Sequence, residues 1–406
     1  MAEEVKYPSY RWVVLLVAWA TFVMLTYNWN FTATRLDMVG DLGITLTQFH
    51  MVFTGPTLAA IFLCVPGGLL GDRFGIRMVV GIGALIAVVG CLLRLTATGF
   101  GTVFGYTILV GVGLGVMFPN LPKLVGVWFP PKQVGLATGI YMTGMGLGMA
   151  LGLATGTMFS SWQSAQLILG IVFAVCVVAW FVLARNKPAG ITVEAHERGS
   201  VTEALSRTVR SKNMWFIIVI QILVGVIILS YIGSLPSVLP AKGMTLGSAS
   251  MVSALAVFGF LVGTIFWPVI STITGIRNPI FVATMVLTGV TGLLVYFLAP
   301  GIGMWVLAFF PGFFIAPGLT FMLMAPVELP EIGPRFAATA AGALLTAFNL
   351  GAFVGLPYIF HPLLEWSSTG AFAFLLGGCV VTGLLGLGIM ELGRKAQEKR
   401  AKEAAG

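Results

Sequence analysis

The sequence predicts an all-α membrane protein in which twelve spanning helices form two bundles of six. Three observations carry this prediction. Hydrophobic residues make up 58% and charged residues 9% of the 406-residue chain, whereas ordinary soluble domains carry about 25% charged residues. Twelve apolar runs each approach the length of about 20 residues that a helix needs to cross a hydrocarbon core. One long polar stretch, 185–213, separates the sixth run from the seventh.

The boundaries of the expected spans follow the apolar runs. The predicted spans are 11–34, 46–70, 78–97, 102–127, 134–159, 165–184, 214–239, 248–273, 279–298, 302–326, 336–363 and 370–392. Residues 1–184 then form a first six-helix bundle, and 214–406 form a second bundle that ends in a charged tail. The stretch 185–213 is expected to be a linker with a short helix at 201–209.

Basic residues are distributed unevenly over the loops. When both termini and 185–213 lie on one side of the membrane, that side holds all of the 22 Lys and Arg except Arg35, Arg94 and Lys242. Cytoplasmic loops carry such an excess, so both termini are expected in the cytoplasm and the protein in the inner, cytoplasmic membrane. The net charge of +8 therefore reflects topology, and we expect no nucleic-acid partner.

A polar turn between the second and third spans carries a motif. It reads Gly68-Leu-Leu-Gly-Asp72-Arg73-Phe-Gly75-Ile-Arg77. Gly68 allows close helix packing, Gly75 allows a left-handed turn, and Asp72 can cap a helix start or pair with an arginine. The motif resembles the signature loop of the major facilitator superfamily. The resemblance implies a transporter in which Gly68, Asp72, Arg73, Gly75 and Arg77 form a gating latch on the cytoplasmic side, and the alternative is an ordinary charged loop.

The two predicted bundles share sequence at an offset of 200 residues. Gly43-Ile-Thr45-Leu46 corresponds to Gly243-Met-Thr245-Leu246, and Gly75-Ile-Arg77 corresponds to Gly275-Ile-Arg277. Matches at the same place in the topology predict parallel repeats, which is also what the resemblance implies. Thr272 stands where the first bundle has Asp72, so we expect the latch to be asymmetric.

Several kinds of chemistry lack the residues that they need. There is no G-x-x-x-x-G-K-[ST] motif for nucleotide phosphates, and the three histidines are far apart in the topology. The four cysteines, Cys64, Cys91, Cys176 and Cys379, lie in apolar runs without metal-ligand spacing. We therefore expect no enzyme activity, no metal site and no cofactor. No Asp or Glu lies at mid-span, so no carboxylate is placed for a proton relay.

Candidate substrate ligands are polar or aromatic residues that lie deep in the spans. Transporters bind substrate near the midplane between repeats, where a polar group is costly unless it is paired or hydrated. The predicted substrate-binding residues are Tyr27 and Asn28 in the first span, Tyr141 in the fifth, Gln221 and Tyr231 in the seventh, and Asn349 in the eleventh. For Asn349 the alternative role is a tie between helices.

The fourth span ends in Pro119-Asn120-Leu-Pro122-Lys123. Asn120 and Lys123 are a second candidate site, which would hold an anion, although Lys123 can instead extend to the membrane interface. The run from Pro119 to Gly139 resembles cyanate-permease-type carriers, and Asn349-Leu-Gly351 is faintly similar to nitrate/nitrite porters. Those porters hold their anion with arginines in spans two and eight, and here these spans contain none.

Together these features predict a secondary active or facilitative transporter, a symporter or uniporter, for a small organic or weakly anionic metabolite. The resemblance implies alternating access by rocking of the two bundles. We expect a monomer whose partners are a small-molecule substrate and the lipid bilayer. An exporter of amphipathic compounds is the first alternative, favoured by the aromatic residues, and a receptor on a transporter fold is the second.

Overall fold

The computed structural model describes residues 8–188, 201–393 and 395. These residues form helices and no strand, and twelve helices are long and apolar enough to cross a membrane. They lie within a few residues of the predicted spans; the first is Arg11–Thr34 and the eighth is Leu246–Thr274. The all-α, twelve-span fold class is thus confirmed, and the protein is a multi-pass membrane protein.

The last span is shorter than the sequence predicts. It ends at Leu387, whereas the apolar run extends to 392. The chain leaves the helix at Gly388, and the Glu391 carboxylate accepts hydrogen bonds from the backbone nitrogens of Arg277, at 2.9 Å, and Asn278. These bonds cap the start of the ninth span, and they explain why the chain after Gly388 is not helical.

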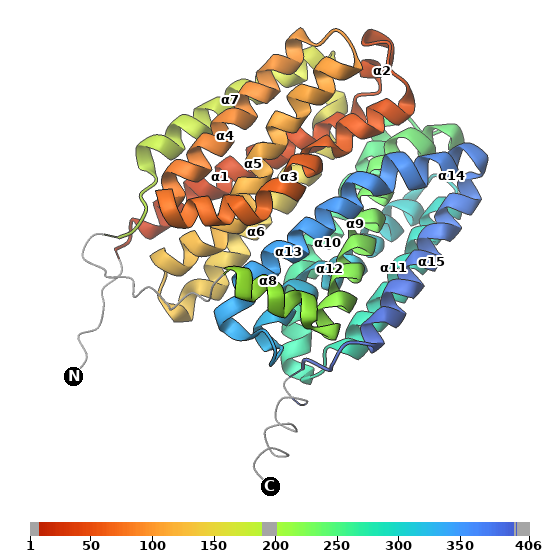
Figure 1. Cartoon of the computed structure of the whole chain (residues 1–406). Coiled ribbons are helices and arrows are strands. Elements are labelled where there is room, and N and C mark those ends of the chain that lie inside the picture. The colour runs from red at the N-terminus through yellow and green to blue at the C-terminus, as the bar shows by residue number, and fades with distance from the viewer. Residues whose placement is uncertain (1–7, 189–200, 394, 396–406) are drawn as a thin grey trace, which may run out of the picture. The chain divides into compact units, whose positions relative to one another are not determined.

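Contacts divide the chain into two compact units, Met1–His196 and Glu197–Gly406, and Figure 1 labels their helices. Unit 1 contains α1 (Arg11–Asn30), η1 (Phe31–Thr34), α2 (Asp37–Asp41), α3 (Leu46–Phe74), α4 (Ile76–Leu93), η2 (Arg94–Thr96), α5 (Phe100–Trp128), α6 (Pro131–Thr155), η3 (Gly156–Met158) and α7 (Trp162–Leu183). Unit 2 contains α8 (Val201–Arg210), α9 (Lys212–Val238), η4 (Leu239–Lys242), α10 (Leu246–Thr274), α11 (Asn278–Phe297), α12 (Ile302–Glu328), α13 (Gly333–Val354), the π-helical η5 (Gly355–Phe360), α14 (His361–Trp366) and α15 (Ser368–Leu387).

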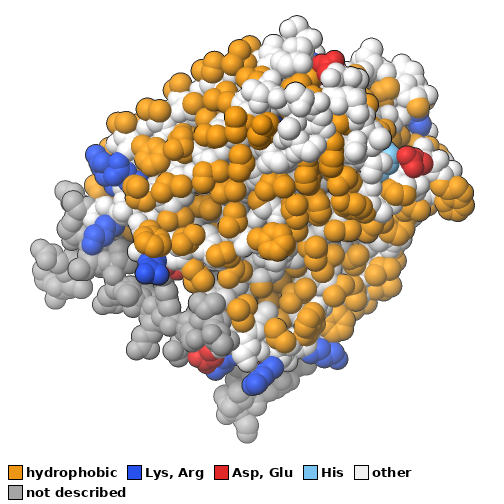
Figure 2. All heavy atoms as spheres, turned by 45° about the horizontal axis from the view of Figure 1, so that its top comes forward, with side chains coloured by type: hydrophobic (Ala, Val, Ile, Leu, Met, Phe, Trp, Pro, Cys, Tyr) orange, Lys and Arg blue, Asp and Glu red, His pale blue; other side chains and the backbone are white. Residues whose placement is uncertain are grey.

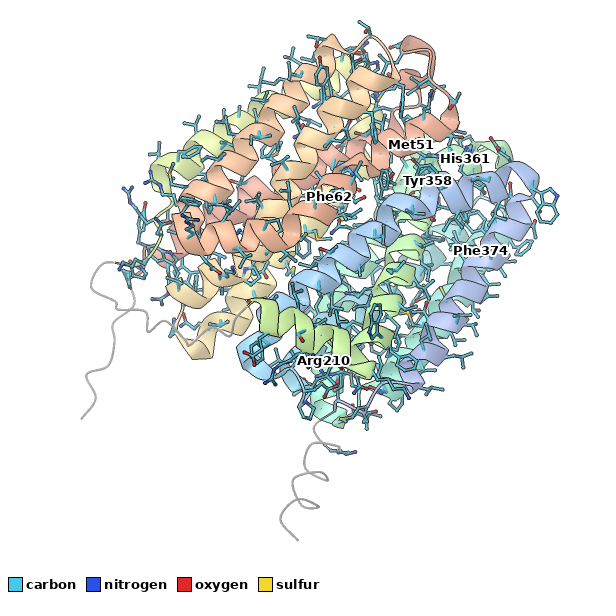
Figure 3. The ribbon with its side chains drawn as sticks, in the orientation of Figure 1. Met51, Phe62, Arg210, Tyr358, His361 and Phe374 are labelled. Carbon is cyan, nitrogen blue, oxygen red and sulfur yellow. The ribbon has the colours of Figure 1, made fainter. Side chains whose placement is uncertain are left out.

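The division falls inside the predicted linker, and α8 coincides with the short helix expected there. Helix α8 packs on α9 and α13 within unit 2: the Trp215 indole nitrogen donates to the Val209 carbonyl at 2.8 Å, and the Arg207 guanidinium lies over the Phe336 ring. Arg210 on α8 lies at one end of unit 2, and Tyr358 and His361 lie at the other (Figure 3). The predicted charged tail, 394–406, lies outside the described residues except for Lys395.

Equivalent helices pack together in the two units. In unit 1, α3 packs on α5 and α1 on α6; in unit 2, α10 packs on α12 and α9 on α13. Glycines make these contacts close. A Cβ atom added to Gly111 would lie 2.2 Å from the Pro56 carbonyl oxygen, and one added to Gly312 would lie 1.7 Å from the Ala256 carbonyl oxygen.

The repeated sequence segments build the same local structure twice. Gly43 and Gly243 both have positive φ, at 60° and 82°, a region that favours glycine. Two residues later, Thr45 caps α3 by accepting a hydrogen bond from the Gln48 backbone nitrogen. Thr245 caps α10 through the equivalent bond from the Ser248 nitrogen. The repeat is therefore a turn and helix-start signal that each unit needs in order to begin its second span.

The outside of the helices is apolar, as a bilayer requires. Val175, Val178 and Val182 on α7 are 63%, 63% and 60% exposed. Figure 2 shows one face on which hydrophobic side chains cover most of the area and lysines and arginines lie mainly near the edges. An exposed apolar surface of this extent marks contact with lipid.

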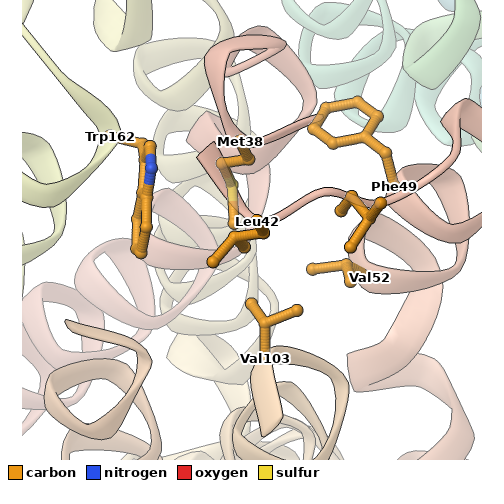
Figure 4. Close-up of a cluster of buried hydrophobic side chains, with 7 residues drawn as sticks. Met38, Leu42, Phe49, Val52, Val103 and Trp162 are labelled. Carbon is orange, nitrogen blue, oxygen red and sulfur yellow. The ribbon is translucent and has the colours of Figure 1, made fainter. Parts of the chain in front are cut away.

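A buried hydrophobic cluster closes one end of unit 1 (Figure 4). It joins α2 to the starts of α3, α5 and α7 through Met38, Leu42, Ile44, Phe49, Val52, Val103 and Trp162. The Trp162 indole nitrogen also donates to Asp41 at 2.9 Å. Helix ends that meet in this cluster are held at fixed positions relative to one another.

Candidate functional site

The polar turn between the second and third spans is shorter in the structure than predicted. Helix α3 continues through Phe74, and only Gly75, with φ of 89°, separates it from α4. Asp72 therefore lies in the last turn of a helix rather than at a helix start. Its carboxylate pairs with the Lys123 ammonium at 2.9 Å, and Lys123 also donates to the Gly68 carbonyl at 2.7 Å.

Asn120 has a structural role similar to that of Lys123. Its amide nitrogen donates to the Gly67 and Val116 carbonyls, both at 2.8 Å. The Asn120 amide packs closely against Gly71, because a Cβ atom added to Gly71 would lie 1.9 Å from the Asn120 side-chain oxygen. Asn120 and Lys123 thus fasten α5 to α3, and in this geometry the Lys123 charge is already neutralised by Asp72.

Arg77, a basic residue of the motif, connects the start of α4 to the end of α7. Its guanidinium donates to the Phe181 carbonyl, and its backbone nitrogen donates to the Asn186 side chain at 2.9 Å. The Trp180 indole nitrogen donates back to the Arg77 carbonyl at 2.9 Å. A cation near the last carbonyls of a helix is favourable, so this contact stabilises the α4–α7 corner of unit 1.

Unit 2 also has a charge pair at the corresponding end, but its acidic and basic residues come from different spans than those of the Asp72–Lys123 pair. Arg277, at the start of α11, pairs with Glu328 of α12 at 2.7 Å. Thr272, which replaces the acid of α3, donates to the Pro268 carbonyl of its own helix. The acidic partner thus lies on the second span, α3, in unit 1 and on the tenth span, α12, in unit 2.

Two of the predicted substrate ligands are buried polar groups without a partner. Gln221 is fully buried, and neither atom of its amide has a hydrogen bond in the described part of the chain. The Tyr231 hydroxyl is likewise buried and without a hydrogen bond, while its ring meets Phe372 edge to face. Because buried polar groups are almost always satisfied, these two are the strongest candidate ligands.

Two others have partners that the sequence did not reveal. The Asn28 amide donates to the Met24 carbonyl at 2.9 Å and to the Leu169 carbonyl at 3.2 Å, and it accepts a hydrogen bond from Gln166. The Tyr27 hydroxyl is hydrogen-bonded to Thr155. The polar groups of Tyr27 and Asn28 are therefore bonded to neighbouring helices, α6 and α7 respectively.

The predicted ligands do not all gather in one place. Gln221 and Asn349 each adjoin the close contact of α9 with α13, in which a Cβ atom on Gly351 would lie 1.9 Å from the Ile222 carbonyl oxygen. The Asn349 amide donates within its own helix, to Leu345 at 2.7 Å. Tyr231 lies ten residues further along α9, which is about 15 Å at 1.5 Å per residue. In unit 1, Tyr141 is buried on α6, fourteen residues before the partner of Tyr27.

One buried charged residue, Arg94, is not among the site residues predicted from the sequence. The charge distribution predicts Arg94 among the few basic residues that are not on the cytoplasmic side, but its side chain is only 1% exposed. Its guanidinium donates to Thr107 at 3.0 Å and to Gln166 at 3.3 Å. Its position three residues inside the predicted end of the third span indicates a functional residue, since charges inside membrane segments are rare and functional.

Comparison with known proteins identifies the family. The model of the Major Facilitator Superfamily matches residues 17–356. The chain belongs to this superfamily. Its fold is also that of a bacterial homologue of the human lysosomal transporter Spinster, solved in an inward-facing conformation, with a TM-score of 0.64 and 17% identity over 94% of this chain and 96% of that one.

Two curated relatives are transporters of anions. A probable sulfoacetate transporter, SauU of Cupriavidus necator, is 24% identical over 86% of this chain and 85% of its own length. The nitrate/nitrite transporter NrtP of Nostoc punctiforme is 28% identical over 51% of this chain and 43% of its own length. The predicted resemblance to nitrate/nitrite porters is confirmed. This superfamily member is a membrane transporter, and alternating access is the general mechanism of its fold.

Proposed function

We propose that this superfamily member carries a small organic anion across the inner membrane as a secondary active or facilitative transporter. The buried amide of Gln221 carries the proposal, because it offers two donors and an acceptor with nothing in the described chain to satisfy them. A carboxylate or sulfonate accepts from such donors. The similarity to a sulfoacetate transporter over most of both chains supports the choice of substrate class.

The proposed substrate site is centred on Gln221 and includes its neighbour Asn349 on α13. Tyr231 on α9 and Tyr141 on α6 remain proposed substrate contacts, as buried aromatic side chains at other depths of their bundles. Tyr27 and Asn28 contribute by positioning α1 against α6 and α7, since their polar groups are already bonded there. The second candidate site, at Asn120 and Lys123, is disfavoured because both side chains have partners on α3.

A ligand panel separates this proposal from the alternatives. We expect millimolar sulfoacetate, or another small carboxylate or sulfonate, to raise the melting temperature of the purified protein in a saturable way. Choline and glycerol serve as cationic and neutral controls. Stabilisation by uncharged sugars or by choline, with none by any small anion, would contradict the proposal.

A second function, export of amphipathic compounds, is favoured by one observation. Aromatic rings of α10 and α12 form a contiguous group in which Trp267 lies 5.2 Å from both Phe266 and Phe313, and Phe309 stacks on Phe313 at 5.6 Å. Aromatic surfaces of this kind bind flat apolar ligands. In the same panel, an exporter would be stabilised by planar amphipathic dyes and not by small anions.

The charge distribution gives a topology that we propose and that labelling can test. In a background without the four native cysteines, a cysteine introduced at Ser200 is expected to be cytoplasmic. It should react with an impermeant maleimide only in inside-out vesicles or after permeabilisation. Labelling in intact cells from outside would overturn the proposed orientation.

The Asp72–Lys123 pair gives a prediction for the proposed latch. Asp72→Asn removes the carboxylate that pairs with the Lys123 ammonium, and we expect it to slow transport while membrane insertion continues. A few kcal/mol of difference between two states is enough to shift a conformational equilibrium strongly. Thr272→Ala, at the equivalent place in unit 2, removes only a bond within one helix and should have little effect. Equal losses of transport rate in the two variants would refute the asymmetric latch.

A further inference from the structure

Three arginines are buried in the described part of the chain, and two of them have a carboxylate. Arg35 pairs with Asp37, and Arg277 pairs with Glu328. Arg94 is the most deeply buried of the three, at 1% exposure. A buried cation needs a counter-charge, because the cost of removing it from water exceeds what neutral neighbours return. Arg94 has none among the residues that the structure describes.

The contacts of Arg94 are all with uncharged oxygens. Its Nε donates to the Thr107 hydroxyl at 3.0 Å, and its Nη1 lies 3.3 Å from the Thr32 hydroxyl, 3.3 Å from the Gln166 amide oxygen and 3.5 Å from the Asn28 carbonyl. Its Nη2 has no hydrogen-bond partner among the described residues. The network fixes one edge of the guanidinium and leaves the two N–H groups of Nη2 unused.

Every carboxylate in the described residues is bound elsewhere. In unit 1, Asp37 is paired with Arg35, Asp41 accepts from Trp162 and Gln163, and Asp72 is paired with Lys123. In unit 2 the partners are Arg207 for Glu203, Arg277 for Glu328, Ser211 and Asn213 for Glu331, His361 for Glu365, and backbone nitrogens for Glu391. No carboxylate among the described residues forms an ion pair with Arg94.

We propose that Arg94 binds the carboxylate or sulfonate group of the transported anion through Nη2. The proposal rests on the proposed function and assigns a charged contact to the same substrate class. A planar guanidinium presents its N–H groups to the oxygens of such a group in a fixed geometry. A neutral analogue would leave the charge uncompensated, so Arg94 makes the carrier selective for anions.

The position of Arg94 indicates at which step it acts. It begins η2 at the end of the third span, and its neighbours Asn28 and Thr32 lie at the end of the first span and in η1. In the proposed topology this is the outer end of unit 1. Both η1 and η2 are short 3-10 segments, whose hydrogen bonds have poorer geometry than those of an α-helix. Because Nη2 is buried here, the proposal requires a shift of these segments that exposes Nη2 to an anion entering from outside.

Four variants of the full-length purified protein test the proposal. Arg94→Gln removes the charge, Arg94→Lys keeps it, and Thr107→Asp supplies an internal carboxylate beside it. Thr96→Asp is the matched control, because it adds the same charge at an exposed position two residues from Arg94. The probes are sulfoacetate, acetate and methanesulfonate, and the readout is the anion concentration that gives half of the maximal rise in melting temperature.

We expect Arg94→Gln to weaken anion binding roughly tenfold or more, Arg94→Lys to retain part of it, and Thr96→Asp to match the unmodified protein. Thr107→Asp should raise the melting temperature without anion and remove the response to anion. If Arg94→Gln does not fold, Thr107→Asp still decides the matter: a response to anion equal to that of the unmodified protein overturns the proposal.

Two further outcomes separate this proposal from the proposed function. If the unmodified protein and Arg94→Gln respond equally to the three anions, the assignment of Arg94 is wrong and the function stands. If the unmodified protein responds to none of them, both are wrong. A purely structural Arg94 would lower the melting temperature on substitution and leave the half-maximal anion concentration unchanged.

Discussion

Replacing Gly312 by leucine is expected to prevent unit 2 from folding. A Cβ atom at this position would lie 1.7 Å from the Ala256 carbonyl oxygen and 2.8 Å from the Phe260 backbone nitrogen. Both atoms belong to the backbone of α10, so no side-chain rotation relieves the clash. Overpacking in a core costs about 1–3 kcal/mol when neighbours can adjust, and here they cannot.

The measurement is the yield of monodisperse protein in detergent together with its melting temperature. Gly377→Leu is the control, since Gly377 is also in a spanning helix and a Cβ atom there meets nothing within 4 Å. We expect little or no folded Gly312→Leu and a normal yield of Gly377→Leu. A Gly312→Leu protein with unchanged yield and melting temperature would show that α10 and α12 are not in such close contact.

Replacing Gln221 by leucine is expected to have opposite effects on stability and on binding. A buried amide without partners costs about 1–3 kcal/mol, so an apolar side chain of similar size should stabilise the ligand-free protein. The same change removes the groups proposed to bind substrate, and affinity should fall roughly tenfold or more. Such an opposition between stability and function is typical of binding sites.

Asn28→Leu is the matched control for this prediction. Asn28 is also a fully buried amide, but its hydrogen bonds are made with Met24, Leu169 and Gln166. We expect it to lower the melting temperature, because it leaves those groups unsatisfied. Melting curves with and without a stabilising anion give both quantities for each variant. If Gln221→Leu and Asn28→Leu destabilise the protein to the same extent, Gln221 is an ordinary packing residue.

The spans and the repeats were predictable because they depend on local properties of the sequence. The length of an apolar run sets the length of a helix across the membrane, and the Gly43–Thr45 and Gly243–Thr245 segments each encode a positive-φ turn and a helix cap. The predicted end of the last span was wrong, because a residue distant along the sequence is involved. Glu391 accepts a hydrogen bond from the backbone at the start of α11, and the chain after Gly388 is not helical.

Partners of the buried polar residues were not predictable in this way. A sequence gives the depth of a residue in the membrane but not the direction in which its side chain points around the helix. Lys123 meets Asp72 across 51 residues, and Gln166 meets Asn28 across 138. Two of the expected ligands, Tyr27 and Asn28, are therefore hydrogen-bonded within unit 1. Arg94 was expected among the charges of the loops, but it is buried.

Solute counterflow tests the central claim, transport of a small organic anion, most directly. Proteoliposomes are loaded with a high concentration of the anion that stabilises the purified protein, then diluted into a trace of the same anion carrying a radioactive label. We predict a transient accumulation of label above equilibrium, absent from liposomes without protein and from proteoliposomes loaded with choline instead. Saturable binding of the anion to purified protein without any counterflow would contradict the account and identify a receptor.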